Sequence, residues 1–260
     1  MYGQSISFNF NSLQTDWIFT ESIQHESSPS KVANAFALGH ANRSAIPYSN
    51  YPNKVVVVTG SLQGSSIPDL DSKIDTFKSY FIGRNKFLDI GYAGSTRRYI
   101  ATATTEPVIT RPNGLVYASF TVTFTTSAQS FGQDVLPTTG LNATGRTLGT
   151  YTDAITFNGT APVQWPILTL NYTAVTGGTG ATITFGNNAN GQQATITTNI
   201  ATNDVVQFDV VNKLVTHNGT MIDFVGALPE FATGPQSVAY SDSLSTRTFN
   251  YNLIYYPMWL

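Results

Sequence analysis

Residues 204–236, DVVQFDVVNKLVTHNGTMIDFVGALPEFATGPQ, decide the fold class of the second half of the chain. Val206, Phe208 and Val210 alternate with other residues, which is typical of a strand with one buried face. Asn212-Lys213 can turn the chain, and Asn218-Gly219 accepts the positive φ angles of a two-residue hairpin. The stretch therefore predicts a meander of three antiparallel strands, at 205–210, 214–217 and 220–224, with further turns at 226–229 and 234–235.

The rest of the second half repeats this short-strand pattern and contains no plausible helix. Turn-forming residues separate the segments, which favours a sandwich or a barrel. The last segment is the clearest, because Phe249, Tyr251, Leu253 and Tyr255 fall on one face. The other expected strands are 155–157, 167–172, 182–185 and 194–197.

The first half is predicted to be α+β, with one helix laid over a sheet. Ser66-Ile67-Pro68-Asp69 resembles a capping box with proline in the first turn. Apolar residues recur at helical spacing from Leu70 to Phe81, and Gly83 is a suitable terminator. The expected strands are 6–10 with 17–20 as its partner, 54–58 buried on both faces, 86–92, 97–104 and 116–126.

Two segments of the chain lack any period. Residues 39–53 contain turn formers and predict a long loop. Residues 127–151 contain five glycines and prolines among Ser, Thr and Asn, and predict a linker. We therefore expect two domains, 1–135 and 136–260, in a fold that is α+β first and an all-β sandwich or barrel second.

The composition restricts the function more than it identifies it. Charged residues make up 11% of the chain, against about 25% in an average soluble domain. A net charge of −2 argues against a basic surface for nucleic acids. Low charge with 12% aromatics fits a surface covered by neighbouring subunits, although a neutral polar surface fits equally well. The absence of cysteine excludes disulfides and thiolate sites.

The ends and the apolar stretches of the chain carry no export or membrane signal. Residues 1–4 lack the basic start and apolar run of a signal peptide. No apolar stretch approaches the ~18 residues of a membrane helix. The sequence predicts a soluble protein without a membrane partner.

The sequence predicts no catalytic, cofactor-binding or metal-binding residue. His25, His40 and His217 are scattered, and none stands at metal-ligand spacing with another histidine or a carboxylate; His217 is interpreted as a hairpin residue. No serine lies in a Gly-x-Ser-x-Gly elbow. The run 177–180 (Gly-Gly-Thr-Gly) is interpreted as a turn into a strand, because neither Lys-Ser/Thr nor a helix follows it.

Asp204 and Asp209 are two carboxylates that could in principle serve calcium binding or acid–base chemistry. Their offset of five residues along a strand points them to opposite faces. We expect Asp209 to accept hydrogen bonds from turn amides near Lys213. The two residues are therefore not expected to act together.

A series of weak motifs follows a recognisable order along the chain. They are VTGSL (58–62), the helical SSIPDLDSKIDTFKSYF (65–81), KFLDIGY (86–92), RRYIATA (97–103), VYASFTVTFTT (116–126), FNGTAP (157–162), PILTL (166–170), the stretch 204–236 and FNYNLIYYPMWL (249–260). In this order the chain resembles the distal tail proteins of long-tailed phages and of related gene transfer agents. The segments 39–53 and 127–151 look longer than the family pattern, and the second domain is too short for an inserted carbohydrate-binding module.

The resemblance implies a structural protein of the virion without catalysis, at the distal end of the tail. Six copies would join through residues 1–135 into a ring that continues the tail tube and surrounds the DNA without reading its sequence. Residues 136–260, galectin-like or OB-like in the family, would project outward. The implied partners are the other copies, the tail tube protein, the tail hub or tip protein and receptor-binding proteins.

One alternative function stays open, and a second one is disfavoured. A carbohydrate-binding module for adhesion to the host surface would use exposed aromatics such as Trp165, Tyr172 and Trp259, although Trp259 is better interpreted as packing at a domain edge. A glycan-cleaving tail enzyme would need two facing carboxylates. The sparse acids offer no such pair.

Overall fold

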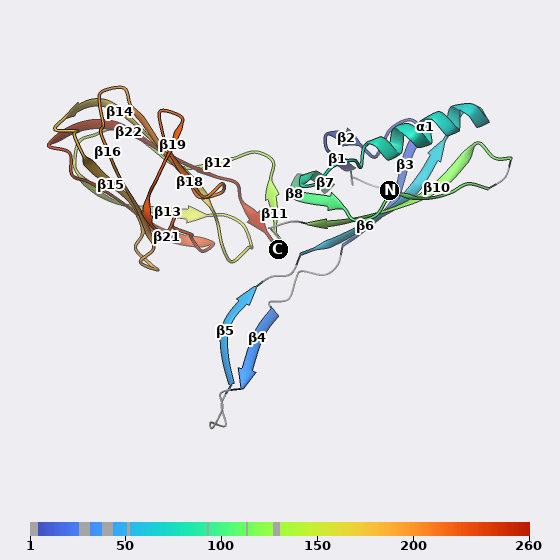
Figure 1. Ribbon diagram of the computed structural model, residues 1–260, viewed down its shortest axis with the longest axis horizontal. Coiled ribbons are helices and arrows are strands. Elements are labelled where there is room, and N and C mark those ends of the chain that lie inside the picture. The colour runs from blue at the N-terminus through green and yellow to red at the C-terminus, as the bar shows by residue number, and fades with distance from the viewer. Residues whose placement is uncertain are drawn as a thin grey trace. The chain divides into compact units, whose positions relative to one another are not determined.

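The computed structural model divides the chain into two compact units, Met1–Gln133 with Leu260 and Asp134–Trp259. Each unit is described by itself below, with the element labels of Figure 1. The first unit is α+β and the second is a β-sandwich, as the sequence predicts. The structure describes residues 5–25, 32–37, 44–50, 53–92, 94–112, 114–126 and 131–260.

The first unit is built on one antiparallel sheet with the strand order β2-β1-β7-β8-β10-β6-β3, and β9 pairs with β10 beside β8. Strand β11 (Gly132–Asp134) crosses the division between the units in sequence. The other strands are β1 (Ser5–Phe8), β2 (Asn11–Ser12), β3 (Ile18–His25), β6 (Val55–Gln63), β7 (Lys86–Tyr92), β8 (Ser95–Ala103), β9 (Val108–Thr110) and β10 (Tyr117–Thr126).

Helix α1 (Ile67–Ser79) forms where the sequence predicts it. The Ser66 hydroxyl caps its start by accepting a hydrogen bond from the backbone N–H of Asp69 at 3.3 Å. An ion pair of 3.0 Å between Lys73 and Asp69 adds support one turn apart. Gly83 has a φ of +106°, but the helix ends before it at Tyr80, so Gly83 redirects the chain after the helix and does not end it.

Helix α1 lies along one face of this sheet (Figure 1) and is held there by phenylalanine rings. The ring centroid of Phe77 lies 4.6 Å from that of Phe120 and 4.9 Å from that of Phe81. Phe8 on β1 lies 4.9 Å from Phe124 on β10. These five side chains are buried, and they form the centre of the first core.

Strand β1 does not pair with residues 17–20, and that prediction is wrong. Asn9 and Phe10 have φ angles of 48° and 65° and reverse the chain directly after β1, so β2 becomes its partner. The other neighbour of β1 is β7, while β3 pairs with β6 at the far end of the sheet. Phe10 therefore lies in a turn and not in the strand.

Strand β6 is not buried on both faces as predicted. Val56, Val58 and Leu62 are fully buried, whereas Val55 and Val57 are only half-buried. The core packs on one face of β6, so its valines alternate in burial although they do not alternate in type.

The predicted loop at 39–53 contains a strand. Strand β5 (Ser44–Asn50) pairs with β4 (Val32–Ala37) in an antiparallel sheet of two strands. Pro47 hides this strand in the sequence because proline cannot donate to a ladder, but a two-stranded sheet has edges on which proline is tolerated. Residues 39–43 and 51–52 of the predicted loop lie outside the described residues.

The second unit is a sandwich of two antiparallel sheets, with the strand orders β12-β22-β14-β17-β18-β19 and β13-β21-β15-β16-β20. Their inner faces share one core of aromatic and aliphatic side chains. The strands are β12 (Thr138–Arg146), β13 (Thr150–Phe157), β14 (Pro166–Thr176), β15 (Ala181–Asn187), β16 (Gln193–Thr198), β17 (Val205–Asp209), β18 (Leu214–His217), β19 (Thr220–Ile222), β20 (Val225–Gly226), β21 (Gly234–Asp242) and β22 (Thr246–Tyr255), with β23 (Met258–Trp259) at the end.

The predicted meander is present as β17, β18 and β19. Asn218 and Gly219 have φ angles of 50° and 77°, which confirms the two-residue hairpin turn. The third strand is shorter than predicted, because the chain leaves the first sheet after Ile222 and enters the second as β20. Gly234-Pro235 begins β21 and is not a turn.

Strand β12 lies inside the segment 127–151 that we predicted to be a linker. It is the edge strand of its sheet, none of its residues is buried, and its ladder with β22 is interrupted by irregularities near Gly140 and Gly145. An edge strand without a buried face carries no hydrophobic alternation. The strand is therefore invisible to a search for periodicity.

We expect Phe77→Ala to cost the first unit about 3–5 kcal/mol, because it removes the ring that joins α1 to β10. Hydrogen–deuterium exchange should become faster in peptides from α1 and β10 and stay unchanged in peptides from 134–259. The matched control is Ile82→Ala, since Ile82 is 73% exposed and its loss should change stability by less than about 0.5 kcal/mol. Equal effects of both variants would contradict the assignment of this core.

Candidate functional site

Asp204 and His217 lie side by side in the structure, although the sequence analysis paired His217 with no carboxylate. Antiparallel pairing of Val206 with His217 brings the two side chains together across the hairpin. The His217 Nε2 and Asp204 Oδ2 atoms are 2.9 Å apart, and the His217 Nδ1 lies 3.4 Å from the Thr198 hydroxyl. The signal for this contact was the register of the meander and not the spacing along the chain.

A hydroxyl, an imidazole and a carboxylate in this order resemble a nucleophilic triad, but the geometry does not support catalysis. The 3.4 Å between Thr198 and His217 exceeds the roughly 2.6–3.2 Å of an activated nucleophile. Asp204 also accepts hydrogen bonds from the Ala201 backbone N–H at 2.7 Å and from the Asn218 amide at 2.8 Å. The cluster fastens the β17–β18 hairpin, in agreement with the interpretation of His217 as a hairpin residue.

The hydrogen bonds of the cluster also act on the acidity of Asp204. Desolvation by burial alone would raise the pKa of its carboxyl. The hydrogen bonds from Asn218, from the Ala201 backbone and from His217 outweigh this effect and lower the pKa below its usual value. The ionised form of Asp204 is therefore part of the folded hairpin.

Asp209 serves a different turn, as the sequence predicts. Its carboxylate accepts hydrogen bonds from the Asn212 backbone N–H at 2.9 Å and from the Asn212 amide at 2.7 Å. These contacts close the turn that leads through Lys213, whose φ is +56°. Asp204 and Asp209 are thus each committed to a turn.

Asp242 is the most deeply buried carboxylate of an ion pair in the second unit. Its side chain is 0% exposed, and its Oδ1 lies 2.7 Å from the Arg247 guanidinium. The Tyr240 hydroxyl donates to the Asp242 Oδ2 at 2.5 Å and lies 3.1 Å from the Tyr172 hydroxyl. Burial raises the pKa of both tyrosines. The ion pair between Asp242 and Arg247 joins the end of β21 to the start of β22 and therefore has a structural role.

The aromatic platform expected for a carbohydrate-binding module is not present. Tyr172 is 1% exposed and belongs to the core, so its predicted exposure is wrong. Trp165 is partly buried and donates its indole N–H to Glu230 at 3.2 Å. Trp259 donates to Asp134 at 3.1 Å, as befits a residue packed at the edge of its unit.

The remaining predicted positions are simple to place. Gly177 and Gly180 have φ angles of 71° and 60° in the connection from β14 to β15, which confirms a turn that enters a strand. His40 lies outside the described residues, and His25 stands at the end of β3. In the described part of the chain no three His, Asp or Glu side chains gather as metal ligands, and no helix is long and apolar enough to cross a bilayer.

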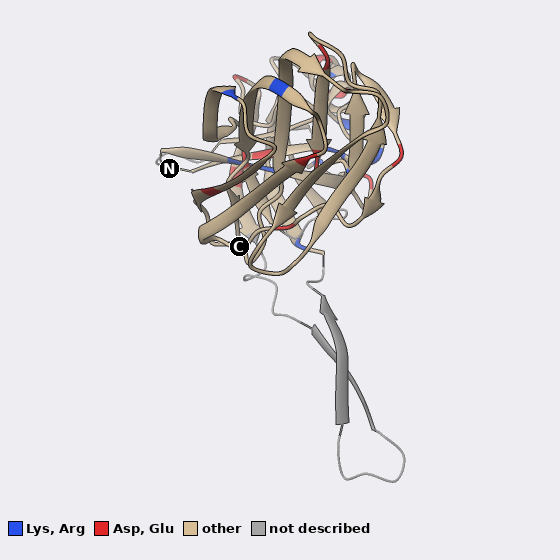
Figure 2. Cartoon of the chain, turned by 90° about the vertical axis from the view of Figure 1, so that its left-hand side faces the viewer, with Lys and Arg blue, Asp and Glu red and all other residues tan. Residues whose placement is uncertain are grey.

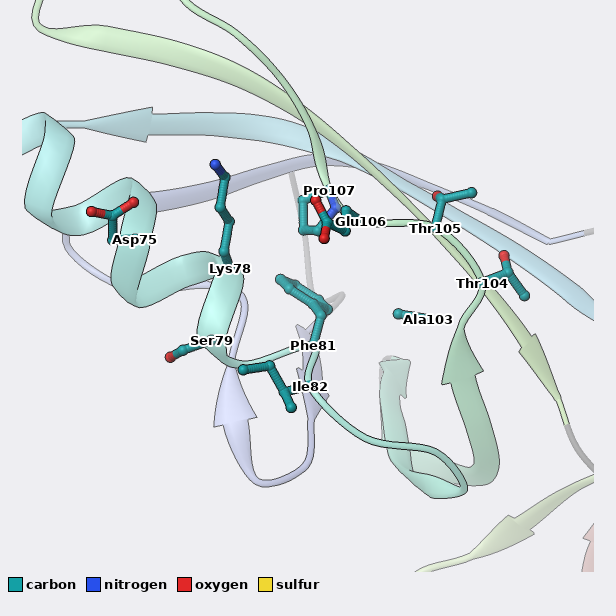
Figure 3. A pocket seen from close by; sticks show the side chains of 10 residues that line it. All are labelled: Asp75, Lys78, Ser79, Phe81, Ile82, Ala103, Thr104, Thr105, Glu106 and Pro107. Atoms are coloured by element: carbon teal, nitrogen blue, oxygen red, sulfur yellow. The ribbon is translucent and has the colours of Figure 1, made fainter.

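A hollow of about 480 Å³ in the first unit lies at the end of α1 (Figure 3). Lys78 and Phe81 line one side, and Glu106 and Pro107 line the other. The neighbouring Ile82 is 73% exposed. The lining of this hollow mixes apolar side chains with polar and charged ones.

Phe10 stands out at the surface of the first unit, because its side chain is 72% exposed and its backbone is left-handed. A bulky side chain at a φ of +65° is strained, and such strain collects at functional positions. The Phe10 ring lies 5.7 Å from that of Phe87, and the Arg98 guanidinium lies over both rings. Arg98 is held by two hydrogen bonds of 2.7 Å to Asp89, so the Phe10 turn presents a preorganised aromatic contact.

The two edges of the main sheet differ in how they are protected. Strand β2 is only two residues long, which limits pairing with another chain. The start of β3 is capped, because the Thr15 hydroxyl accepts from the Ile18 N–H at 3.0 Å and the Gln14 side chain accepts from the Thr20 N–H at 3.0 Å. Residues 22–25 follow an irregularity in the ladder with β6 and lie beyond these caps.

Comparison with solved structures finds the same architecture in a phage protein. The crystal structure of the SPP1 Dit (gp 19.1) protein, described as a paradigm of the hub adsorption apparatus in phages that infect Gram-positive hosts, covers 99% of both chains with a TM-score of 0.69 and 11% identity. The chain has the fold of a siphophage distal tail protein. This confirms the resemblance found in the sequence and the α+β and sandwich order of the two parts.

The other comparisons do not extend the conclusion that the chain has this fold. Two structures of the phage p2 baseplate in its activated conformation, with strontium and with calcium, match 98–99% of the chain at 10–11% identity, but their TM-scores of 0.48 are too low to support an argument. No protein-family model and no curated protein matches the chain. The likeness thus shows the fold, and the function rests on the proposals below.

We expect the Asp204 cluster to contribute stability at neutral pH that is lost in acid. Because the folded pKa of Asp204 is lowered, this contribution is complete above the ordinary value of 3.8 and disappears as pH falls through the folded value. Asp204→Asn should cost about 1–2 kcal/mol near pH 7, and its free energy of unfolding should converge with that of the wild type in strong acid.

Urea unfolding of both proteins from about pH 7 to about pH 2 measures this difference. Asp223→Asn is the control, since Asp223 is an exposed acid of the same unit whose replacement should change stability near pH 7 by less than about 0.5 kcal/mol. A constant difference between wild type and Asp204→Asn at every pH would rule out a role for the ionised carboxylate.

Proposed function

We propose that this protein is a structural component of a phage virion, a distal tail hub that joins the tail tube to the tail tip. The observation that carries the proposal is the shared fold with SPP1 Dit over 99% of both chains. Because the similarity to SPP1 Dit covers both units, it favours a complete hub protein over a protein that shares a single domain with a hub protein. The proposed role requires no catalytic step, in keeping with carboxylates that are committed to turns.

Six copies would form a ring through the first unit. A contact between two different surfaces of the same chain closes into a ring when the rotation between copies is right. The short edge β2 with the exposed Phe10 turn is one such surface, and β3 beyond its caps is a different one at the other end of the sheet. These two surfaces are our candidates for the contact between copies.

The charges of the first unit suit a channel for DNA. Residues 1–133 carry ten basic and eight acidic side chains, a formal charge of +2. A strongly basic wall would hold the phosphate backbone by counterion release, whereas a weakly charged wall lets DNA pass. Charged residues are sparse in the whole chain, at 11% (Figure 2). The proposed channel would surround DNA without reading its sequence.

The second unit would face outward and hold tail-tip or receptor-binding proteins. Its three basic residues stand against seven acidic ones in 134–259, a formal charge of −4. Its edge strands β19 and β20 present Met221 and Val225, which are 68% and 79% exposed. Exposed apolar side chains on two adjacent sheet edges favour a protein partner there.

The mass of the purified protein in solution tests the ring directly. We expect particles of about 169 kDa, six times the 28.1 kDa chain, in mass photometry at rising concentration. Negative-stain images should show six-fold rings with a central hole. A chain that stays monomeric at every concentration, or that forms particles of another symmetry, would contradict the ring.

We expect Phe10→Asn to stabilise the monomer and weaken the ring. Asparagine adopts a left-handed backbone more readily than phenylalanine, so the strain of the turn is relieved. The exposed aromatic contact is lost at the same time. The control is Met221→Asn in the second unit, an exposed apolar residue away from the proposed ring surface. Unfolding curves and mass photometry of both variants decide the matter, and an unchanged ring in Phe10→Asn would remove Phe10 from the interface.

A further inference from the structure

A second hollow lies on the outer face of the five-stranded sheet and is independent of the proposed hub contacts. It encloses about 260 Å³ between strands β13, β21 and β15 and the turn that leads into β16. None of its lining residues is charged. The side chains that face it are mainly hydroxyls and amides, among them Thr152, Thr184, Gln193 and Ser241. The hollow is therefore polar and neutral.

Several of these polar groups have no hydrogen-bond partner among the residues that the structure describes. Thr152, Gln193 and Ser241 line the hollow, and their side chains make no hydrogen bond to the described residues. By contrast, Thr184 shares a hydrogen bond of 2.9 Å with Thr195 on the neighbouring strand. The unpartnered hydroxyls and amide are free to bind hydroxyl groups of a ligand.

The floor of the hollow is kept low by two small residues, Gly186 and Ala239. Gly186 does not have a left-handed φ, so its backbone does not require glycine. A Cβ at this position would lie 3.3 Å from both the Gln192 carbonyl oxygen and the Gln193 Cβ, which is a tight contact. The absent side chain of Gly186 leaves room above the floor of the hollow.

We propose that this hollow binds a neutral oligosaccharide. Neutral sugars are recognised by uncharged hydroxyl and amide groups, and the hollow offers these without any charge. A formal charge of −4 on residues 134–259 disfavours acidic polymers. Extended peptides use sheet edges or apolar grooves, whereas this hollow lies on the face of a sheet whose ladders are complete on both sides of β21 and β15.

The size of the hollow fits a short part of a longer chain. Its volume is below the roughly 300–1,000 Å³ of pockets that enclose drug-sized ligands. It is open along the sheet, where further threonines of β13 and β16 continue the polar face. One or two sugar rings would sit in the hollow, with the rest of the oligosaccharide along these strands. The site differs from the aromatic platform expected from Trp165, Tyr172 and Trp259.

Binding of the full-length protein to an array of neutral and anionic oligosaccharides tests the proposal. The neutral members are glucose, galactose, mannose and N-acetylglucosamine oligomers, and the anionic ones are hyaluronate and glycerol teichoic acid. We expect binding to at least one neutral class. Ala239→Leu, which fills the hollow, should weaken it at least tenfold. The matched control Ala174→Leu, an exposed alanine on β14 of the other sheet, should leave it unchanged.

Ser241→Ala provides a second variant that removes a free hydroxyl without adding bulk, and it should also weaken binding. Exchange protection of the 134–259 peptides confirms that each variant is folded. No binding by the wild type, binding only to anionic members, or equal binding by wild type, Ala239→Leu and Ser241→Ala would each overturn the proposal. Mass photometry tests the proposed ring independently of this binding experiment, so the ring and the oligosaccharide site can be refuted separately.

Discussion

The burial of aromatic rings against one another is the interaction on which both parts of the molecule depend. In the first unit, Phe77 joins the helix to Phe120 on the sheet. In the second unit, the ring centroids of Tyr240 and Phe249 lie 4.9 Å apart across the two sheets of the sandwich. With so few charges in the chain, large apolar side chains supply most of the free energy that holds the layers together. The exposed faces can then remain nearly neutral, which leaves them available for contacts with other chains.

Elements with one buried face could be predicted from the sequence, and elements without such a face could not. Helix α1 and the strands of the meander alternate clearly because one side of each packs against a core. Strand β12 has no buried residue, and β5 contains Pro47, so neither carries a period. The hydrophobic pattern also does not predict which distant strands pair. Nothing local in residues 17–20 distinguishes β6 from β1 as a partner. Short-range periodicity reports burial, and it does not report which strands meet.

The candidate functional residues also divide into those that the local sequence predicts and those that it does not. Asp209 and its turn could be predicted because an aspartate before Asn-Lys satisfies nearby amides. The contact of Asp204 with His217 depends on strand register over 13 residues, and the spacing of the two residues along the chain does not reveal it. Phe10 alternates with Phe8 in the sequence, which predicts a strand. In the structure its left-handed backbone places it in the turn after β1. The neutral hollow is assembled from four segments of the sheet, and no motif marks such a surface along the chain.

The hydrogen bonds of the Asn218 side chain in the Asn218-Gly219 turn affect the chemical stability of the protein. An asparagine before glycine is prone to deamidation, because the next backbone nitrogen can attack the side-chain amide. The Asn218 amide is held on both sides, donating to Asp204 and accepting from the Val205 N–H, each at 2.8 Å. Asn158, which also precedes glycine, makes no side-chain hydrogen bond to the described residues. Of these two asparagines, Asn158 should therefore deamidate first in the stored protein, while Asn218 keeps its side-chain amide.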